Sequence, residues 1–294
     1  MTRGLVLIDK PAGMTSHDVV ARLRKIYGQK RIGHAGTLDP EATGLLVIAL
    51  GNITRLLDYF QAKTKMYSGE VVFGIETDSY DSTGTVVSRV EVPTLDIDLL
   101  GRTIAGMHGE ISQVPPVVSA LKVDGKRLYQ YHRESLAIEI KPRRIYISSI
   151  SFSQAQEPNV IRIEVVCGAG TYIRSIAHDL GQALGVGAHL RNLRRLQSGS
   201  FSVDEARSIE DIGKETTMHP ASALRDFTVI GLDDVLASRA RDGSKVVLTG
   251  TTSDQVILFD AGQGLLTEWG QLIGLYKRHS GDVYEPSVIL PAIN

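Results

Sequence analysis

The sequence predicts an α+β fold rather than a doubly wound α/β fold. Apolar runs typical of strands recur along the whole chain, and helical patterns separate only some of them. The regular alternation of strand and helix that would indicate a parallel sheet is rare. The chain has 294 residues, of which 43% are hydrophobic and 22% charged. This is enough for one large or two smaller globular domains.

The first 114 residues contain most of the clear elements. Strands are expected at residues 5–8, 45–50, 65–74, 85–90 and 109–114, and helices at about 17–27, 54–60 and 95–107. The first helix has Thr15 and Ser16 to cap its start and Gly28 to end it, and its apolar positions recur at helical spacing. Thr54 is expected to cap the second helix. Residues 81–84 form an expected turn, after which strand 85–90 returns as a hairpin partner.

The remaining elements are shorter and follow turn signals. Strands are expected at 119–123, 144–153 and 160–167, a helix at 172–184 and an extended segment at 189–196. Asp124 and Gly125 form an expected turn. From Thr228 the composition changes, with a short helix at 233–238 and short strands at 245–248, 255–259 and 272–277. Asp242 and Gly243 supply a turn in this last region, which is expected to form a small separate domain.

A dinucleotide-binding motif is excluded by spacing. Gly168-Ala169-Gly170 leads into an expected helix, as the glycine-rich loop of a Rossmann fold does. However, the third small residue of that fingerprint would fall on Ile173, which is too large for the close packing needed there.

Membrane insertion and secretion are also disfavoured. No apolar run approaches the ~20 residues that span a bilayer, and the N-terminus shows no signal-peptide pattern. Cys167 is the single cysteine, so no disulfide can form within the chain, and its apolar surroundings predict a small buried side chain. We therefore expect a protein of a reducing, cytoplasmic compartment.

Charge is unevenly distributed although the net charge is only −1. Residues 122–144 carry seven Lys or Arg against three Asp or Glu, whereas residues 228–294 carry five against eight. The basic segment can be read as a surface that contacts nucleic-acid phosphates. It can equally be read as an ordinary solvated face, and charge alone does not separate the two.

Residues 31–40 contain a candidate reactive carboxylate. Asp39 follows two glycines and a histidine, and Pro40 biases it away from helical backbone angles. An apolar run follows at once, so Asp39 should lie in a constrained loop just before a buried strand. Asp39 can be a turn or helix-capping residue. Alternatively, it can be a positioned nucleophile or base, which requires such a rigid frame.

Five motifs, in order, give the chain a resemblance to a known family. The segment Gly33-His34-Ala35-Gly36-Thr37-Leu38-Asp39-Pro40 with Ala42-Thr43-Gly44 resembles the catalytic motif of the TruB-type tRNA pseudouridine synthases. The other four motifs are Gly4–Pro11 with Gly13–Ser16, Lys65-Met66-Tyr67, Gly168–Arg174, and His189–Arg195. The resemblance covers about the first 200 residues.

The resemblance implies roles for individual residues. Asp39 would be the catalytic carboxylate, Arg174 its cationic partner, and Tyr67 the ring that packs on the target base and assists proton removal. His34 would pack against the RNA where the flipped base had been. Tyr172 and Leu193 would line the uridine pocket. Phosphate contacts would come from Lys122, Lys126, Arg127, Arg133, Arg143, Arg191, Arg194 and Arg195.

The resemblance also implies an architecture and a substrate. The fold would be a mixed, mostly antiparallel sheet with helices around a central cleft over residues 1–227, followed by a small PUA-like barrel over 228–294. Residues from about 115 to 143 would be an insertion that grips RNA. The reaction would be isomerisation of uridine 55 in the T loop of tRNA by a monomer, without metal, cofactor or obligate protein partner.

Two alternatives use the same basic surfaces. A non-catalytic RNA-binding protein or tRNA-folding chaperone would need the arginines and lysines, but could lose Asp39, Tyr67 and Arg174, which are all present. An RNA-guided synthase of the related archaeal and eukaryotic type depends on partner proteins and usually carries a larger C-terminal barrel and tails, and this chain has no basic tail. The stand-alone bacterial type is therefore favoured.

Overall fold

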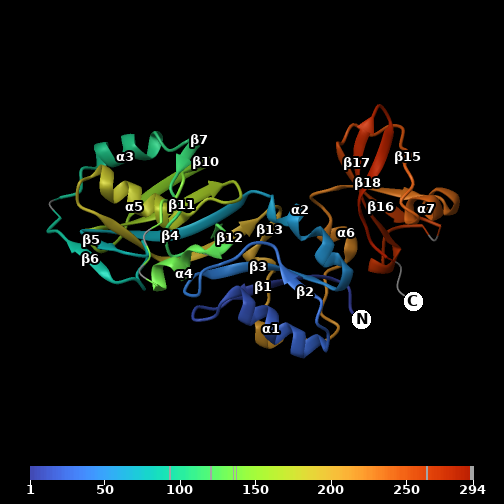
Figure 1. Cartoon of the computed structure of the whole chain (residues 1–294), viewed down its shortest axis with the longest axis horizontal. Coiled ribbons are helices and arrows are strands. Elements are labelled where there is room, and N and C mark those ends of the chain that lie inside the picture. Colours follow the sequence, from blue (N-terminus) through green and yellow to red (C-terminus); the bar gives the residue numbers. More distant parts are fainter. Residues whose placement is uncertain (93, 120, 135, 137, 263, 292–294) are drawn as a thin grey trace. The chain divides into compact units, whose positions relative to one another are not determined.

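Figure 1 shows the computed structural model, which describes residues 1–291 except 93, 120, 135, 137 and 263. The chain divides into two units, each described here by itself. Unit 1 contains Met1–Pro40, Leu45–Gln61 and Gly199–Asn294, and unit 2 contains Glu41–Gly44 and Ala62–Ser198. None of the helices in the described part of the chain is both long and apolar enough to cross a membrane.

Unit 1 is organised around two strands that are buried on both faces. Strand β1 (Gly4–Lys10) neighbours β3 (Thr43–Leu50), and β2 (Ile32–His34) pairs antiparallel with β3. Leu45, Val47 and Ala49 of β3 join one hydrophobic cluster, and the alternate residues Leu46, Ile48 and Leu50 join another. A strand covered on both faces has apolar residues at successive positions, which explains the apolar run Leu45–Leu50 that follows the Asp39 loop.

Helix α1 (Ser16–Tyr27) covers one of these faces. Thr15 caps it, with its hydroxyl accepting from the Asp18 amide and the Asp18 carboxylate accepting from Thr15 in return. Gly28 ends it in a left-handed conformation with φ of 63°. Its buried stripe packs with β1 and β3, as the helical spacing predicted, through Val19, Val20, Leu23, Tyr27 and partly buried Ile26.

The C-terminal sheet is packed into the other face of unit 1. Its strand order is β14-β16-β17-β18-β15, with β14 parallel to β16 and the remaining pairs antiparallel. The bounds are β14 (Thr228–Leu232), β15 (Val246–Val247), β16 (Gln255–Asp260), β17 (Leu272–Ser280), β18 (Val283–Ile289) and helix α7 (Asp234–Arg241). Ile257, Leu272 and Leu275 share a hydrophobic cluster with Leu5 and Val47. Residues more than 200 positions apart thus form one core.

Short elements complete unit 1. They are η1 (Gly51–Leu56), α2 (Leu57–Gln61), β13 (Phe201–Ser202), η2 (Val203–Glu205), η3 (Ile209–Asp211), α6 (Pro220–Ala223) and η4 (Trp269–Gln271). The Trp269 indole N–H donates to the Met218 carbonyl at 2.9 Å, so the polar edge of this ring is satisfied.

Unit 2 is an antiparallel sheet in the order β12-β4-β11-β10-β7. The strands are β4 (Lys65–Phe73), β7 (Gly109–Gln113), β10 (Arg143–Gln154), β11 (Val160–Cys167) and β12 (Ala188–Ser198). The first residues of β3 pair parallel with β12, Thr43 with Arg194 and Gly44 with Arg195. A side chain on Gly44 would lie 2.3 Å from the Arg195 carbonyl oxygen, so only glycine fits there.

Two helices cover one face of this sheet, as Figure 1 shows for α3 (Ile97–Ala105) and α5 (Ile173–Ala183). Their shared core includes Val71 of β4, Ile163 of β11, and Ile176 and Leu180 of α5. The insertion adds a hairpin of β8 (Lys122–Val123) and β9 (Lys126–Arg127), followed by α4 (Leu128–Arg133). Asp124 and Gly125 both have positive φ at its turn, as expected of that dipeptide.

Two sequence-based expectations were wrong, and two strands were missed. Thr54 does not cap a helix, because it lies inside η1 and its hydroxyl donates to the Gly51 carbonyl. The hairpin partner of β6 (Val86–Arg89) is the short strand β5 (Ile75–Thr77) and not residues 65–74. Strands β14 and β18 of the C-terminal sheet were not anticipated.

Candidate active site

Asp39 lies in unit 1, in the loop between β2 and β3, and is partly buried. Pro40, the residue after Asp39, is held in place by Lys10, which is 0% exposed. The Lys10 ammonium donates to the carbonyl oxygens of Pro11, Met14 and Pro40 at 2.6–2.8 Å. The Gly13 amide also donates to the Pro40 oxygen, at 3.1 Å. The backbone is thereby fixed on the C-terminal side of Asp39.

The residue before Asp39 is held by Ser16. The Leu38 amide donates to the Ser16 hydroxyl oxygen at 2.8 Å, and the same hydroxyl donates to the Leu38 carbonyl at 3.1 Å. Both side chains are buried, with 2% of Ser16 and 3% of Leu38 exposed. A carboxylate flanked by two anchored residues is restricted to few positions, as a reacting group requires.

His34 lies at the end of β2 in unit 1, paired in register with Ile48 of β3. Its side chain is partly buried. Gly33 precedes it, and a side chain there would meet Leu57 at 2.8 Å, so the strand approaches α2 closely. The histidine is therefore carried on a well-packed strand rather than on a free turn.

Arg174 lies in unit 2, in the first turn of α5, and is 3% exposed. Its guanidinium donates to the carbonyl oxygens of Ser79 and Val118 at 2.9 Å each. The same group forms an ion pair with Asp81, with 3.3 Å between its NH1 and the Asp81 Oδ2. Sequence reasoning identified the arginine but not Asp81, Ser79 or Val118, because no local spacing links them to it.

The segment that carries Asp81 is itself tightly folded. The Asp81 carboxylate accepts from the Ser79 hydroxyl at 2.8 Å and from the Thr83 hydroxyl at 2.6 Å. Tyr80 adopts a positive φ of 62° and stacks on His178 of α5, with ring centroids 3.9 Å apart. Burial raises the pKa of the Tyr80 phenol, and the nearby Glu76 adds to the effect. This strained loop is therefore packed onto the helix that bears Arg174.

Tyr67 and Leu193 of unit 2 both pack, partly buried, against the core beneath α5. Tyr172 precedes α5, and its amide and carbonyl are both bound by the Gln113 side chain, at 2.9 and 3.0 Å. Gln113 is 2% exposed, so this end of the helix is fixed to β7. Gln113 was not identified from the sequence, since a buried glutamine leaves no periodic signal.

Lys65, two residues before Tyr67, lies on the same buried face of β4 opposite Cys167. Burial lowers the pKa of the Lys65 ammonium from 10.5 to about 8, and the nearby positive charge of Arg195 contributes. Burial raises the pKa of the Cys167 thiol to about 11. Cys167 is thus the small buried side chain that its context predicted.

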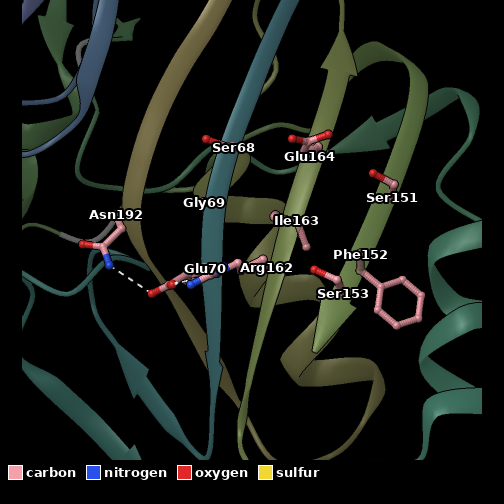
Figure 2. A pocket seen from close by; sticks show the side chains of 10 residues that line it. All are labelled: Ser68, Gly69, Glu70, Ser151, Phe152, Ser153, Arg162, Ile163, Glu164 and Asn192. Carbon is pink, nitrogen blue, oxygen red and sulfur yellow. Dashed lines mark hydrogen bonds and ion pairs between the residues drawn. The ribbon is translucent and has the colours of Figure 1, made fainter. Parts of the chain in front are cut away.

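A cavity of about 450 Å³ lies on the opposite face of the same sheet (Figure 2). Ser68 and Glu70 line it, and side chains on a strand alternate between faces, so Tyr67 points the other way. Figure 2 shows Glu70 bonded to Asn192 and Arg162 across the strands. This polar cavity is therefore separate from the face that bears Tyr67, and it is not the candidate reaction site.

The arginines of β12 differ in their surroundings. Arg195 is 1% exposed, so its side chain cannot reach a phosphate at the surface. Arg191 forms ion pairs with Glu70 and Glu157. Arg194 is partly buried and donates to the Thr43 hydroxyl at 3.4 Å. We therefore remove Arg195 from the residues proposed to contact RNA.

Most of the cationic side chains considered in the insertion are more exposed than the arginines of β12. Lys122, Arg127, Arg133 and Arg143 are exposed, whereas Lys126 is ion-paired with Glu134 and lies over the Tyr131 ring at 4.9 Å. Leu128 anchors the segment, with none of its side chain exposed. In the part of the chain that the structure describes, no three His, Cys, Asp or Glu side chains are grouped as a metal site would require.

Comparison with known proteins identifies the family of the chain. Residues 24–173 match the family model for the TruB family pseudouridylate synthase N-terminal domain, and residues 174–237 match the tRNA pseudouridylate synthase B C-terminal domain. The tRNA pseudouridine synthase B of Solibacter usitatus is 37% identical over 98% of this chain and 99% of its own length. That of Mycobacterium tuberculosis is 39% identical over 83% of this chain and 91% of its own length.

Solved structures share the fold. A chain of an H/ACA RNP bound to a substrate RNA containing 2′-deoxyuridine superposes with a TM-score of 0.69 at 23% identity, covering 97% of this chain and 84% of that one. A chain of an archaeal box H/ACA sRNP complex gives the same TM-score at 24% identity, with 98% and 86% covered. The predicted α+β pseudouridine synthase fold is confirmed. From its sequence matches over nearly its whole length, the chain belongs to the TruB family of pseudouridylate synthases.

Proposed function

We propose that this chain isomerises uridine to pseudouridine at position 55 in the T loop of tRNA, with Asp39 as the catalytic carboxylate. The observation that carries the proposal is the fixed loop of unit 1, in which the residues on both sides of Asp39 are anchored by buried side chains. Family membership and the names of the curated relatives support tRNA as the substrate.

The reaction exchanges one bond to the sugar for another. The C1′–N1 glycosidic bond breaks, the base turns, and a C1′–C5 bond forms, while the proton lost from C5 is balanced by one gained at N1. No electrons are gained or lost overall. Asp39 would act either by attack on C1′ or by assisting a glycal route, and both require an ionised carboxylate held beside the sugar.

The other site residues have complementary proposed roles. Arg174 would supply positive charge to the reaction, as the family resemblance implies, and its guanidinium is held by two carbonyl oxygens and Asp81. Tyr67 would pack on the base and take part in moving its proton. Tyr172 and Leu193 would shape the uridine pocket. Extruding the base costs a few kcal/mol, and His34 would compensate by packing where the base had stacked.

The insertion would hold the T stem-loop. Its exposed cations, Lys122, Arg127, Arg133 and Arg143, are available to phosphates, whereas Lys126 would first have to leave Glu134. RNA loops of this kind are recognised by shape and by unstacked bases. The proposal includes action as a monomer in the cytoplasm, and a division of the chain into a catalytic segment (1–227) and a C-terminal segment (228–294) that shares its core with β1 and β3.

The test is a direct assay on unmodified tRNA transcript. Wild-type protein is expected to convert uridine 55, and Asp39→Asn is expected to bind tRNA normally but form product at least ~10³-fold more slowly. Asp58→Asn, a change at an exposed carboxylate of α2, is the matched control and should behave as wild type. Substantial product from Asp39→Asn, or product mapping to another uridine, would overturn the assignment.

A further inference from the structure

We propose that Ser16 is a positioning residue for Asp39, holding the catalytic loop by a two-way hydrogen bond to the Leu38 peptide. The inference rests on the proposed function of Asp39 and names a residue on which that function depends. The Ser16 hydroxyl accepts from the Leu38 amide at 2.8 Å and donates to the Leu38 carbonyl at 3.1 Å. One side-chain oxygen therefore fixes both polar groups of the residue that directly precedes the carboxylate.

The rigidity of this contact comes from its surroundings. Ser16 is the first residue of α1, and its side chain is 2% exposed, so water does not compete for these hydrogen bonds. The start of the helix also carries a reciprocal cap between Thr15 and Asp18, which stabilises the first turn and is separate from the contact between Ser16 and Leu38. The helix in turn is packed on β1 and β3 through its apolar stripe. Ser16 thus transmits the position of a packed helix to the loop.

If another anchor held the loop on the N-terminal side of Asp39, Ser16 would be needed for stability but not for positioning the carboxylate. The described anchors from Lys10 and Gly13 act on Pro40, which follows Asp39. Ser16 acts on Leu38, which precedes it. Because the two anchors act on opposite sides of Asp39, loss of the Ser16 hydroxyl should let the carboxylate shift while Pro40 stays in place. A shift of about 1 Å at a reacting group can slow chemistry by ~100-fold.

The experiment compares Ser16→Ala and Ser16→Cys with Thr15→Ala. Thr15→Ala removes the neighbouring N-cap hydroxyl, so it weakens the same helix start but leaves the Ser16 contact to Leu38. Single-turnover rates at saturating enzyme, tRNA dissociation constants and thermal midpoints are measured for all three variants, for wild type and for Asp39→Asn.

We expect Ser16→Ala to lower the single-turnover rate by ~10- to 100-fold while the dissociation constant changes by less than about twofold. Ser16→Cys keeps a weaker hydrogen-bonding group and should fall between Ser16→Ala and wild type. Thr15→Ala should lower the thermal midpoint by a few degrees and leave the rate within about twofold.

Two results would overturn the inference alone. One is a rate within about twofold of wild type in Ser16→Ala, or in Ser16→Cys if the alanine variant does not fold. The other is an equal loss of rate in Thr15→Ala, which would show that helix stability and not the contact to Leu38 matters. An inactive wild type or an active Asp39→Asn would instead overturn the proposed function, and this inference with it.

Discussion

Asp81 and Arg174 form a largely buried ion pair between a loop and the first turn of α5, with 3.3 Å between Oδ2 and NH1. The two side chains are 21% and 4% exposed. The guanidinium also donates to two backbone carbonyls, which fix its plane. A buried guanidinium needs such partners, because desolvation without them is costly. The loop at residues 79–81 and the Val118 backbone thus determine where Arg174 lies.

Asp81→Asn should weaken both the fold and the chemistry. The substitution keeps the size of the side chain but removes the charge that faces Arg174, and should lower the free energy of unfolding by about 1–3 kcal/mol. Because Arg174 would be less firmly placed, the single-turnover rate should fall by at least ~10-fold. Denaturant unfolding and rapid-quench assays measure the two effects. Asp124→Asn, at an exposed turn of the insertion, is the control. Wild-type values in both measurements would show that the pair is dispensable.

Lys65 should make stability rise with pH above neutrality. Its pKa is about 8 in the folded protein against 10.5 ordinarily, so the unfolded chain binds more protons between these values. Below pH 8 both states are protonated and the full destabilisation of about 3 kcal/mol is present. As pH rises through 8 the folded protein gains stability, by about 1 kcal/mol between pH 7 and 9.

The Lys65→Met variant isolates this effect, because methionine fills similar space without a titrating group. The difference in unfolding free energy between wild type and Lys65→Met should change with pH from 7 to 9, whereas the difference for Lys30→Met, at an exposed lysine, should not. The Cys167 thiol, whose pKa burial raises to about 11 in the folded protein, ionises more readily in the unfolded chain, but both proteins carry it, so its contribution cancels in the difference. A pH-independent difference for Lys65→Met would contradict the prediction.

The insertion should account for much of the salt dependence of tRNA binding. Replacing the exposed Lys122, Arg127, Arg133 and Arg143 by glutamine removes up to four phosphate contacts. The slope of log affinity against log salt should become shallower by about 2–4, with little effect on the single-turnover rate at saturating enzyme.

The matched control neutralises four exposed cations elsewhere, Arg89, Arg102, Lys214 and Arg239. This variant has the same net charge as the insertion variant, so it separates local contacts from the general field of the protein. If both variants shift the slope equally, the insertion charges are only a solvated face.

Truncation after residue 227 should abolish cooperative folding rather than merely weaken RNA binding. The removed segment supplies Ile257, Trp269, Leu272, Leu275 and Leu290 to the cluster that covers β1 and β3. Burial of five such side chains contributes about 10 kcal/mol, which is comparable to the whole stability of a domain.

Thermal and denaturant unfolding of the truncated chain measure this effect. Val247→Ser, at a side chain of the same sheet that is 60% exposed, should leave the unfolding midpoint unchanged. A truncated protein that unfolds cooperatively at the wild-type midpoint would show that the C-terminal sheet is an independent domain.

Most of the local elements could be predicted from the amino-acid sequence alone. Helix α1, strands β1, β3 and β4 and the Asp124–Gly125 turn follow from periodicity, capping residues and turn chemistry, which act over a few residues. The same locality made the motif around Asp39 recognisable. Alternating apolar and polar residues indicate that the two faces of a strand differ, but they do not indicate which elements cover each face.

The long-range partners of these residues became visible only in the folded structure. Asp81 and Arg174 are 93 positions apart, Gln113 and Tyr172 are 59 apart, and Ser16 and Leu38 are 22 apart. Each of these contacts depends on the packing of whole helices and strands, so no spacing in the sequence encodes it. For the same reason the sequence did not predict that Arg195, one of three arginines on β12, is buried. The candidate reactive residues were assigned by the resemblance of short local motifs to a family, whereas the residues that hold them in place depend on how the chain folds.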